Sequence, residues 1–205
     1  MRVEHPVSAR ACAAAIGALL AAADGLTDED LLAPSRCRGW SRLDTLVHVH
    51  LGLQEMLLGV VSPTDAEPDV DAVSYWRSDP PGNDDSADAI DQIGYLHRLS
   101  SAYRRPGGAV GHLRITAETL AQAVERMPEG RVRFQGHVLD TGDFLATWAT
   151  ELAVHHLDLD LDADAPRPDP GALRLARRTA EALAGRPIEA TTDAEATLRG
   201  WDRVG

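Results

Sequence analysis

The sequence contains no lysine and few aromatic residues: all 20 basic residues are arginines, and Phe, Trp and Tyr make up 4% of the chain. With 32 acidic residues, the formal net charge is −12. A chain this acidic repels nucleic-acid phosphates and anionic lipid surfaces, so we expect neither nucleic acid nor a membrane as a partner. The 205 residues are 44% hydrophobic, enough for one sizeable core built largely from Ala, Leu and Val.

Cysteine is scarce as well, with only Cys12 and Cys37 in the sequence. Two cysteines cannot form the disulfide framework of a small secreted protein, so we expect a reducing, cytoplasmic location. Cys12 is expected to be a buried, unreactive thiol. The apolar stretch over residues 11–23 is similar in composition to a signal peptide, but its larger side chains recur at helical spacing and indicate an internal helix. No segment is expected to be long and apolar enough to span a membrane.

Helical periodicity recurs along the chain, whereas the two-residue alternation of β-strands is nearly absent. The sequence therefore predicts an all-α fold: a single domain over residues 1–205, in which a four-helix bundle carries additional short helices and a long loop after the second helix. The expected helices are residues 8–24, 41–61, 87–103, 111–126, 141–161, 169–184 and 194–199, and residues 131–134 are expected to be extended.

Two features near the first two helices refine this prediction. Ser8 is expected to cap the first helix, and Ser41 with Asp44 three residues later has the pattern of a capping box. Residues 62–86 are rich in Pro and Asp and predict a loop or short lid. Its Tyr75 and Trp76 either cover a pocket or anchor the loop to the core.

The helix expected over residues 141–161 carries the residues that best suit metal chemistry. At about 100° per residue, Glu151 and His155 lie on the same arc as Phe144 and Trp148, which is the apolar side. A carboxylate on an apolar face is strongly desolvated unless a cation is bound to it, and no Arg lies one turn away on this stripe. Glu and His four residues apart project side by side, as in helical pairs that bind a divalent ion. The same pair also occurs in ordinary helices without a metal.

A third ligand has to come from another helix, and the second helix offers His48 and His50. The helical wheel places His50 among apolar side chains such as Leu46. It places His48 at the edge of that face, near Asp44 and Glu55. The pattern of residues alone favours His50 and leaves the choice between the two histidines open.

Two blocks of sequence carry a family resemblance. The first block is Cys37-Arg-Gly-Trp40-Ser-Arg42 followed by Leu46-Val-His48-Val, and the second is Glu151-Leu-Ala-Val-His155-His156-Leu-Asp158. Together they resemble the mycothiol-dependent maleylpyruvate isomerase N-terminal-domain family of the DinB-like superfamily. In that family the metal-binding histidine lies eight residues after the Trp, and the Glu and first His of the second block supply the other ligands. The resemblance therefore implies a metal site of His48, Glu151 and His155.

The resemblance also implies a function. Three protein ligands leave metal positions open, which suits catalysis. Zinc is the implied ion and mycothiol the implied cosubstrate, a small thiol whose thiolate the metal stabilises for nucleophilic attack. Because the 205 residues hold no counterpart of the isomerase's carboxy-terminal sterol-carrier-like domain, we expect a thiol S-transferase acting on an electrophilic small molecule rather than the isomerase itself. A non-catalytic metal-binding helical module and a metal-assisted hydrolase remain as alternatives.

Trp148, Asp158 and His156 complete the set of residues considered. Family members often have Arg three residues before the ligand Glu; Trp148 takes that position here, so we expect it to contact the cofactor and an anion clamp to be missing. Asp158 either orients the imidazole of His155 through its second nitrogen or caps the helix. His156 points about 100° away from His155 and is not expected to be a ligand. The sequence does not determine the oligomeric state and is compatible with a homodimer.

Overall fold

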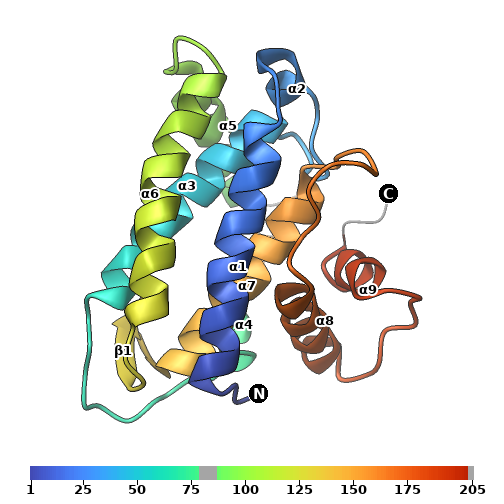
Figure 1. Ribbon diagram of the computed structural model, residues 1–205. Helices are drawn as coiled ribbons and strands as arrows, with labels where there is room; N and C mark the ends of the chain where they lie inside the picture. The colour runs from blue at the N-terminus through green and yellow to red at the C-terminus, as the bar shows by residue number, and fades with distance from the viewer. Residues whose placement is uncertain (79–86, 203–205) are drawn as a thin grey trace.

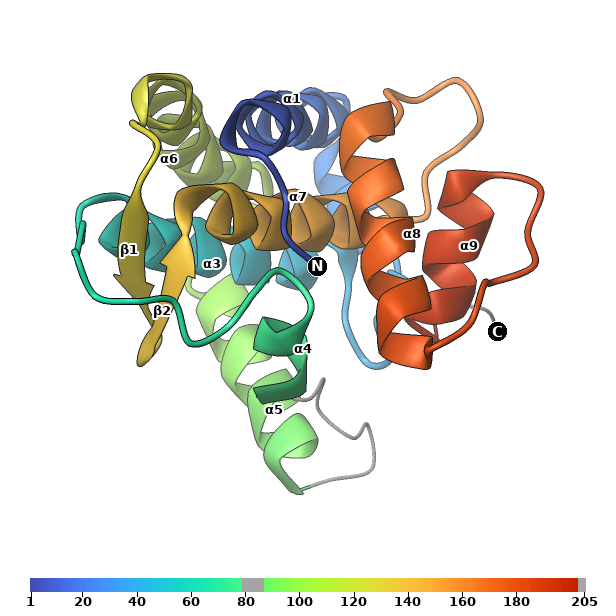
Figure 2. The ribbon, with the colours of Figure 1, turned by 90° about the horizontal axis from the view of Figure 1, so that it is seen from below.

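The computed structural model describes residues 1–78 and 87–202, and this part of the chain is helical with one small sheet (Figure 1). The elements are α1 (His5–Asp24), α2 (Asp28–Leu32), α3 (Arg42–Val60), α4 (Ser74–Ser78), α5 (Ala87–Ser101), α6 (Gly107–Arg126), β1 (Arg131–Phe134), β2 (His137–Asp140), α7 (Thr141–Asp158), α8 (Pro170–Ala184) and α9 (Asp193–Gly200). Helices α1, α3, α6 and α7 form a four-helix bundle, in which α1 and α3 each pack against both α6 and α7 (Figure 2). The predicted all-α, DinB-like class is confirmed.

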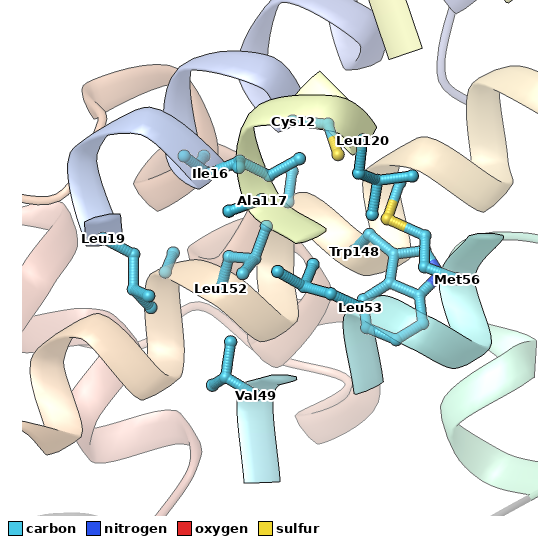
Figure 3. Close-up of a cluster of buried hydrophobic side chains, with 14 of the residues drawn as sticks. Cys12, Ile16, Leu19, Val49, Leu53, Met56, Ala117, Leu120, Trp148 and Leu152 are labelled. Atoms are coloured by element: carbon cyan, nitrogen blue, oxygen red, sulfur yellow. The ribbon is translucent and has the colours of Figure 1, made fainter. Parts of the chain in front are cut away.

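The core of the bundle consists mainly of small and branched aliphatic side chains, as the composition predicts. Figure 3 shows side chains of all four bundle helices meeting around Leu152 of α7, which is 1% exposed. Cys12 of α1 belongs to this cluster and is fully buried, and burial raises the pKa of its thiol far above the ordinary value, as expected for an unreactive cysteine. Every residue from 141 to 150 of α7 is buried. Helix α7 is therefore the central element of the fold.

The third bundle helix is α6, and α5 packs outside the bundle against α3 (Figure 2). The break between the two helices lies where the Pro-Gly-Gly sequence predicts it, but α6 begins at Gly107 rather than at residue 111. The N–H of Gly107 donates a hydrogen bond to Asp28 Oδ1 at 2.8 Å, so one of the free donors of the first turn is satisfied from α2. Helix α7 ends at Asp158 rather than at residue 161, because Asp160 takes a left-handed conformation with φ of 50°.

Helix starts follow the capping chemistry in one case and depart from it in another. At α3 the predicted capping box is present: Asp44 N–H donates to Ser41 Oγ at 3.1 Å, and Ser41 N–H donates to Asp44 Oδ2 at 2.9 Å. The prediction that Ser8 caps the first helix is wrong. Helix α1 begins at His5, and the hydroxyl of Ser8 donates back to the carbonyl of Glu4 at 3.0 Å.

Short elements occur where the sequence analysis predicts none. Helix α2 begins with a capping box of Thr27 and Asp30. Helix α4 lies inside the segment predicted to be a loop, and it begins where Asp71 Oδ1 accepts hydrogen bonds from the N–H groups of Val73 and Ser74. Residues 79–86 of that predicted loop lie outside the described residues.

Strand β2 pairs antiparallel with β1 and turns the predicted extended piece into a hairpin. The two turn residues, Gln135 and Gly136, have positive φ values of 47° and 83°. A two-residue type I′ hairpin turn requires positive φ at both positions. Gln is uncommon in that conformation, so the sequence carries only a weak turn signal here.

Helix α1 is, within the described residues, the one helix long and apolar enough to cross a membrane. This finding corrects the expectation that no segment meets that criterion. Half of its most apolar window is buried inside the fold, and the core helices of globular proteins pass the same test. The criterion is therefore weak evidence for a membrane span.

Gly59 of α3 marks the tightest contact between α3 and the hairpin side of α7. A Cβ at this position would lie 2.5 Å from Cζ of Phe144, which is fully buried. We expect Gly59→Ala to lower the free energy of unfolding by about 1–3 kcal/mol through overpacking. Gly111→Ala in α6 is the matched control, because its Cβ would meet no atom within 4 Å; it should raise stability by up to about 1 kcal/mol. Urea denaturation measures both changes, and equal effects would contradict the proposed packing.

Candidate metal centre

Three side chains with metal-binding atoms converge between α3 and α7. His48 projects from α3, and Glu151 and His155 project from successive turns of α7. The Nε2 atom of His48 lies 3.3 Å from Glu151 Oε1, and the Nε2 atom of His155 lies 3.0 Å from the same oxygen. One potential ligand atom from each residue lies within 4.8 Å of the other two. This is the donor set that the family resemblance implies.

The packing of α3 directs His48 and His50 toward different neighbours. His50 points toward α6, where its Nε2 lies 3.1 Å from the hydroxyl of Thr116, and it takes no part in the cluster. His48 instead faces α7 and Glu151. The helical wheel does not show this difference, because α3 packs against α5, α6 and α7 and the wheel does not tell which of its sides faces α7.

Electrostatics keep the carboxylate of the cluster ionised. Burial raises the pKa of Glu151, but the charge of His155 and hydrogen bonds from His155 and His48 outweigh burial and hold that pKa well below its usual range. Burial lowers the pKa of His155, whereas the Glu151 charge and hydrogen bonds with Asp158, Cys37 and Glu151 raise it well above the ordinary value. Glu151 is thus an anionic side chain with two imidazoles beside it.

The sequence leaves two roles open for Asp158, orienting His155 or capping the helix, and the structure shows the contact that the first role needs. Its Oδ2 accepts a hydrogen bond from His155 Nδ1 at 3.0 Å, which leaves Nε2 of that ring directed at Glu151. The thiol of Cys37 donates to the same Asp158 oxygen at 3.2 Å, and Asp158 is fully buried. His156 lies on another side of α7, with its Nε2 at 2.9 Å from the carbonyl of Pro166. It contributes nothing to the cluster.

The segment before α3 supplies contacts that the sequence analysis did not assign. The Trp40 ring covers both imidazoles, with centroid distances of 5.0 Å to His48 and 6.4 Å to His155. Arg42, the first residue of α3, links the start of that helix to the end of α7, because its Nε donates to the carbonyl of Leu159 at 2.7 Å. Cys37 and Trp40 both belong to the first block of the family resemblance, and that membership was the signal available in the sequence.

A cavity of 720 Å³ opens beside the cluster. His48 and Glu151 lie in its wall, together with side chains from α4, α5 and the hairpin turn. Trp148 also lines the cavity one turn before Glu151, but it is 8% exposed and its ring packs against Phe134 at a centroid distance of 5.8 Å. Trp148 therefore borders the cavity but is largely a core residue.

Comparison with known families agrees with this geometry. A family model described as the mycothiol maleylpyruvate isomerase N-terminal domain matches residues 12–160. The chain belongs to this family. The matched range contains the whole cluster and its surroundings, whereas α8 and α9 lie outside it. No curated protein and no solved structure matches the chain.

If Asp158 fixes the orientation of His155, its removal should weaken the binding of a metal ion to this site. We expect Asp158→Asn to weaken zinc binding about 10- to 100-fold, because groups that orient a ligand imidazole typically contribute that much. Competition with a chromophoric chelator measures the affinity. Asp162→Asn, a change at an exposed aspartate just beyond α7, is the control and should bind zinc as the unmodified protein does. Unchanged affinity of the Asp158 variant would show that this contact does not hold the ligand in place.

Proposed function

We propose that this member of the mycothiol maleylpyruvate isomerase N-terminal domain family is a zinc-dependent enzyme that transfers a small thiol to an electrophilic substrate. The observation that carries the proposal is the convergence of His48, Glu151 and His155 beside a cavity large enough for small molecules. The family supports mycothiol as the thiol, and the scarcity of cysteine supports a cytoplasmic location. The activity proposed is thiol S-transfer, or isomerisation by the same thiol chemistry.

The residues of the cluster fit a divalent ion by their chemistry. Two imidazoles and one carboxylate are ligands of catalytic zinc sites, and three protein ligands leave room for a further one. Apart from the two imidazoles, no described cationic side chain pairs with Glu151, so a bound cation would balance its charge. A zinc ion bound here would supply a Lewis acid that lowers the pKa of a thiol, so that a thiolate is present near neutral pH.

The protein's own groups would position the reactants. Asp158 fixes the orientation of His155, and Trp40 shields the two imidazoles on one side, which limits access of water to the ligands. The cavity leads to the edges of His48 and Glu151, so a thiol and an electrophile can meet there. Holding both molecules in one cavity converts their encounter into a step within a complex.

A spectroscopic titration tests the thiol in this proposal. Cobalt is substituted for zinc, and mycothiol, glutathione and a simple alkyl thiol are added in turn while thiolate-to-metal absorption is recorded. We expect a saturating band with mycothiol at submillimolar concentration. A protein that holds cobalt but responds to no thiol would contradict the thiol chemistry and favour a hydrolase or a non-catalytic metal-binding module.

A further inference from the structure

The cavity beside the cluster has an aromatic wall. Tyr75 and Trp76 of α4 line it and lie edge to face at a centroid distance of 5.5 Å, and Tyr95 of α5 lines it with 49% of its surface exposed. Leu58 of α3, 63% exposed, adds an aliphatic surface. Large apolar side chains left accessible inside a cavity favour a ligand with an apolar, flat body.

Two carboxylates and one imidazole lie in the wall of the cavity. Among the described residues that line it, none is Arg, and the acidic groups are Glu55 and Glu151. Glu55 Oε2 accepts a hydrogen bond from the amide of Gln135 at 2.9 Å, and no described cation pairs with it.

The balance of charges stays negative when the reactants of the proposed function are counted. Two positive charges of a divalent ion are matched by Glu151 and by one thiolate. The charge of Glu55, an exposed side chain of the cavity wall, is then left without a compensating charge on the described residues that line the cavity. A substrate that carries a carboxylate would meet this charge, and none of the described residues that line the cavity is an Arg that could bind it, whereas a neutral or cationic substrate would not be repelled.

We propose that the electrophile of this domain has an aromatic or similarly flat apolar body and carries no negative charge. The inference rests on the proposed function, since it names the substrate class of the same cavity. A substrate with two carboxylate groups would therefore not be expected for this chain. Glu55 is a specificity-determining residue in this view, because it disfavours anions without taking part in the cluster.

Binding of three unreactive probes tests the substrate class. Naphthalenemethanol, naphthoate and naphthalenemethylammonium share one ring system and differ in charge. Isothermal titration calorimetry with zinc-loaded and with metal-free protein gives their affinities without any turnover. We expect naphthoate to bind about tenfold more weakly than the alcohol, and the ammonium compound to bind at least as well as the alcohol.

Two variants connect this ranking to one side chain. Glu55→Gln should narrow the gap between naphthoate and the alcohol about three- to tenfold, while Glu125→Gln, at an exposed glutamate of α6 outside the cavity, should leave it unchanged. Naphthoate binding as tightly as the alcohol, or no binding of any probe, would overturn the inference. The zinc content of the same samples is a separate readout: a protein that takes up no zinc refutes the proposed function, while the ranking in the metal-free protein still decides the inference.

Discussion

His48→Ala is expected to abolish stoichiometric zinc binding, whereas His50→Ala should leave about one ion per chain. The reason is geometric: the imidazole of His48 lies 3.3 Å from Glu151, and that of His50 lies against Thr116 on the α6 side. Elemental analysis of untagged protein after dialysis with excess zinc gives the stoichiometry. In the unmodified protein, added zinc should also raise the melting temperature by mass action, and this effect should be lost in the His48 variant.

The His50 variant is a demanding control for this experiment, because it removes the same ring two residues away. We expect it to lower the free energy of unfolding by about 1–3 kcal/mol, since the Thr116 hydroxyl loses its hydrogen bond with His50 and a small void replaces the imidazole. Loss of zinc from the His50 variant with retention by the His48 variant would show that the helix face deduced from the wheel is the functional one. No zinc in the unmodified protein would remove the basis of the metal centre.

Glu151→Gln is expected to reduce zinc affinity more than about 100-fold, with any thiol-dependent turnover falling in parallel. The amide keeps the shape of the side chain but removes the negative charge that lies between two imidazoles. This loss should exceed the effect of Asp158→Asn, because a direct ligand contributes more than a group that orients one. Chelator competition and thiol-transfer rates, measured on the same preparation, test whether the two quantities change together.

The matched control for this change is Glu125→Gln, which makes the same chemical substitution on an exposed face of α6. It should alter neither quantity. Retained zinc affinity in the Glu151 variant would contradict its role as a ligand. A variant that keeps its zinc but loses turnover would instead assign Glu151 to proton transfer.

The part of the site that lies on α7 could be predicted from the sequence, because its geometry is local. Glu151 and His155 are four residues apart, and helical periodicity alone places them side by side. The partner on α3 could not be fixed in this way. Whether His48 or His50 faces α7 depends on which neighbour covers each side of α3, and that is a property of the assembled bundle. Only the resemblance to a family selected His48.

The surroundings of the site depend on still longer-range contacts. Cys37 and Asp158 are 121 positions apart, and their contact exists because the segment before α3 lies across the end of α7. The hairpin was missed for a different reason: Gln135 occupies a left-handed position usually taken by Asn or Gly, so the local turn signal was weak. Long amphipathic helices and their caps were predictable since their signals are repeated or chemically specific.

The central position of α7 predicts that backbone amides are protected from exchange to different degrees across the fold. Amide hydrogens in the middle of α7, which has neighbours on every side, should exchange with solvent only when the whole domain unfolds. The aromatic wall belongs to α4 and to α5, which packs on the outside of α3, so we expect the amide hydrogens of those two helices to exchange through local openings of lower free energy.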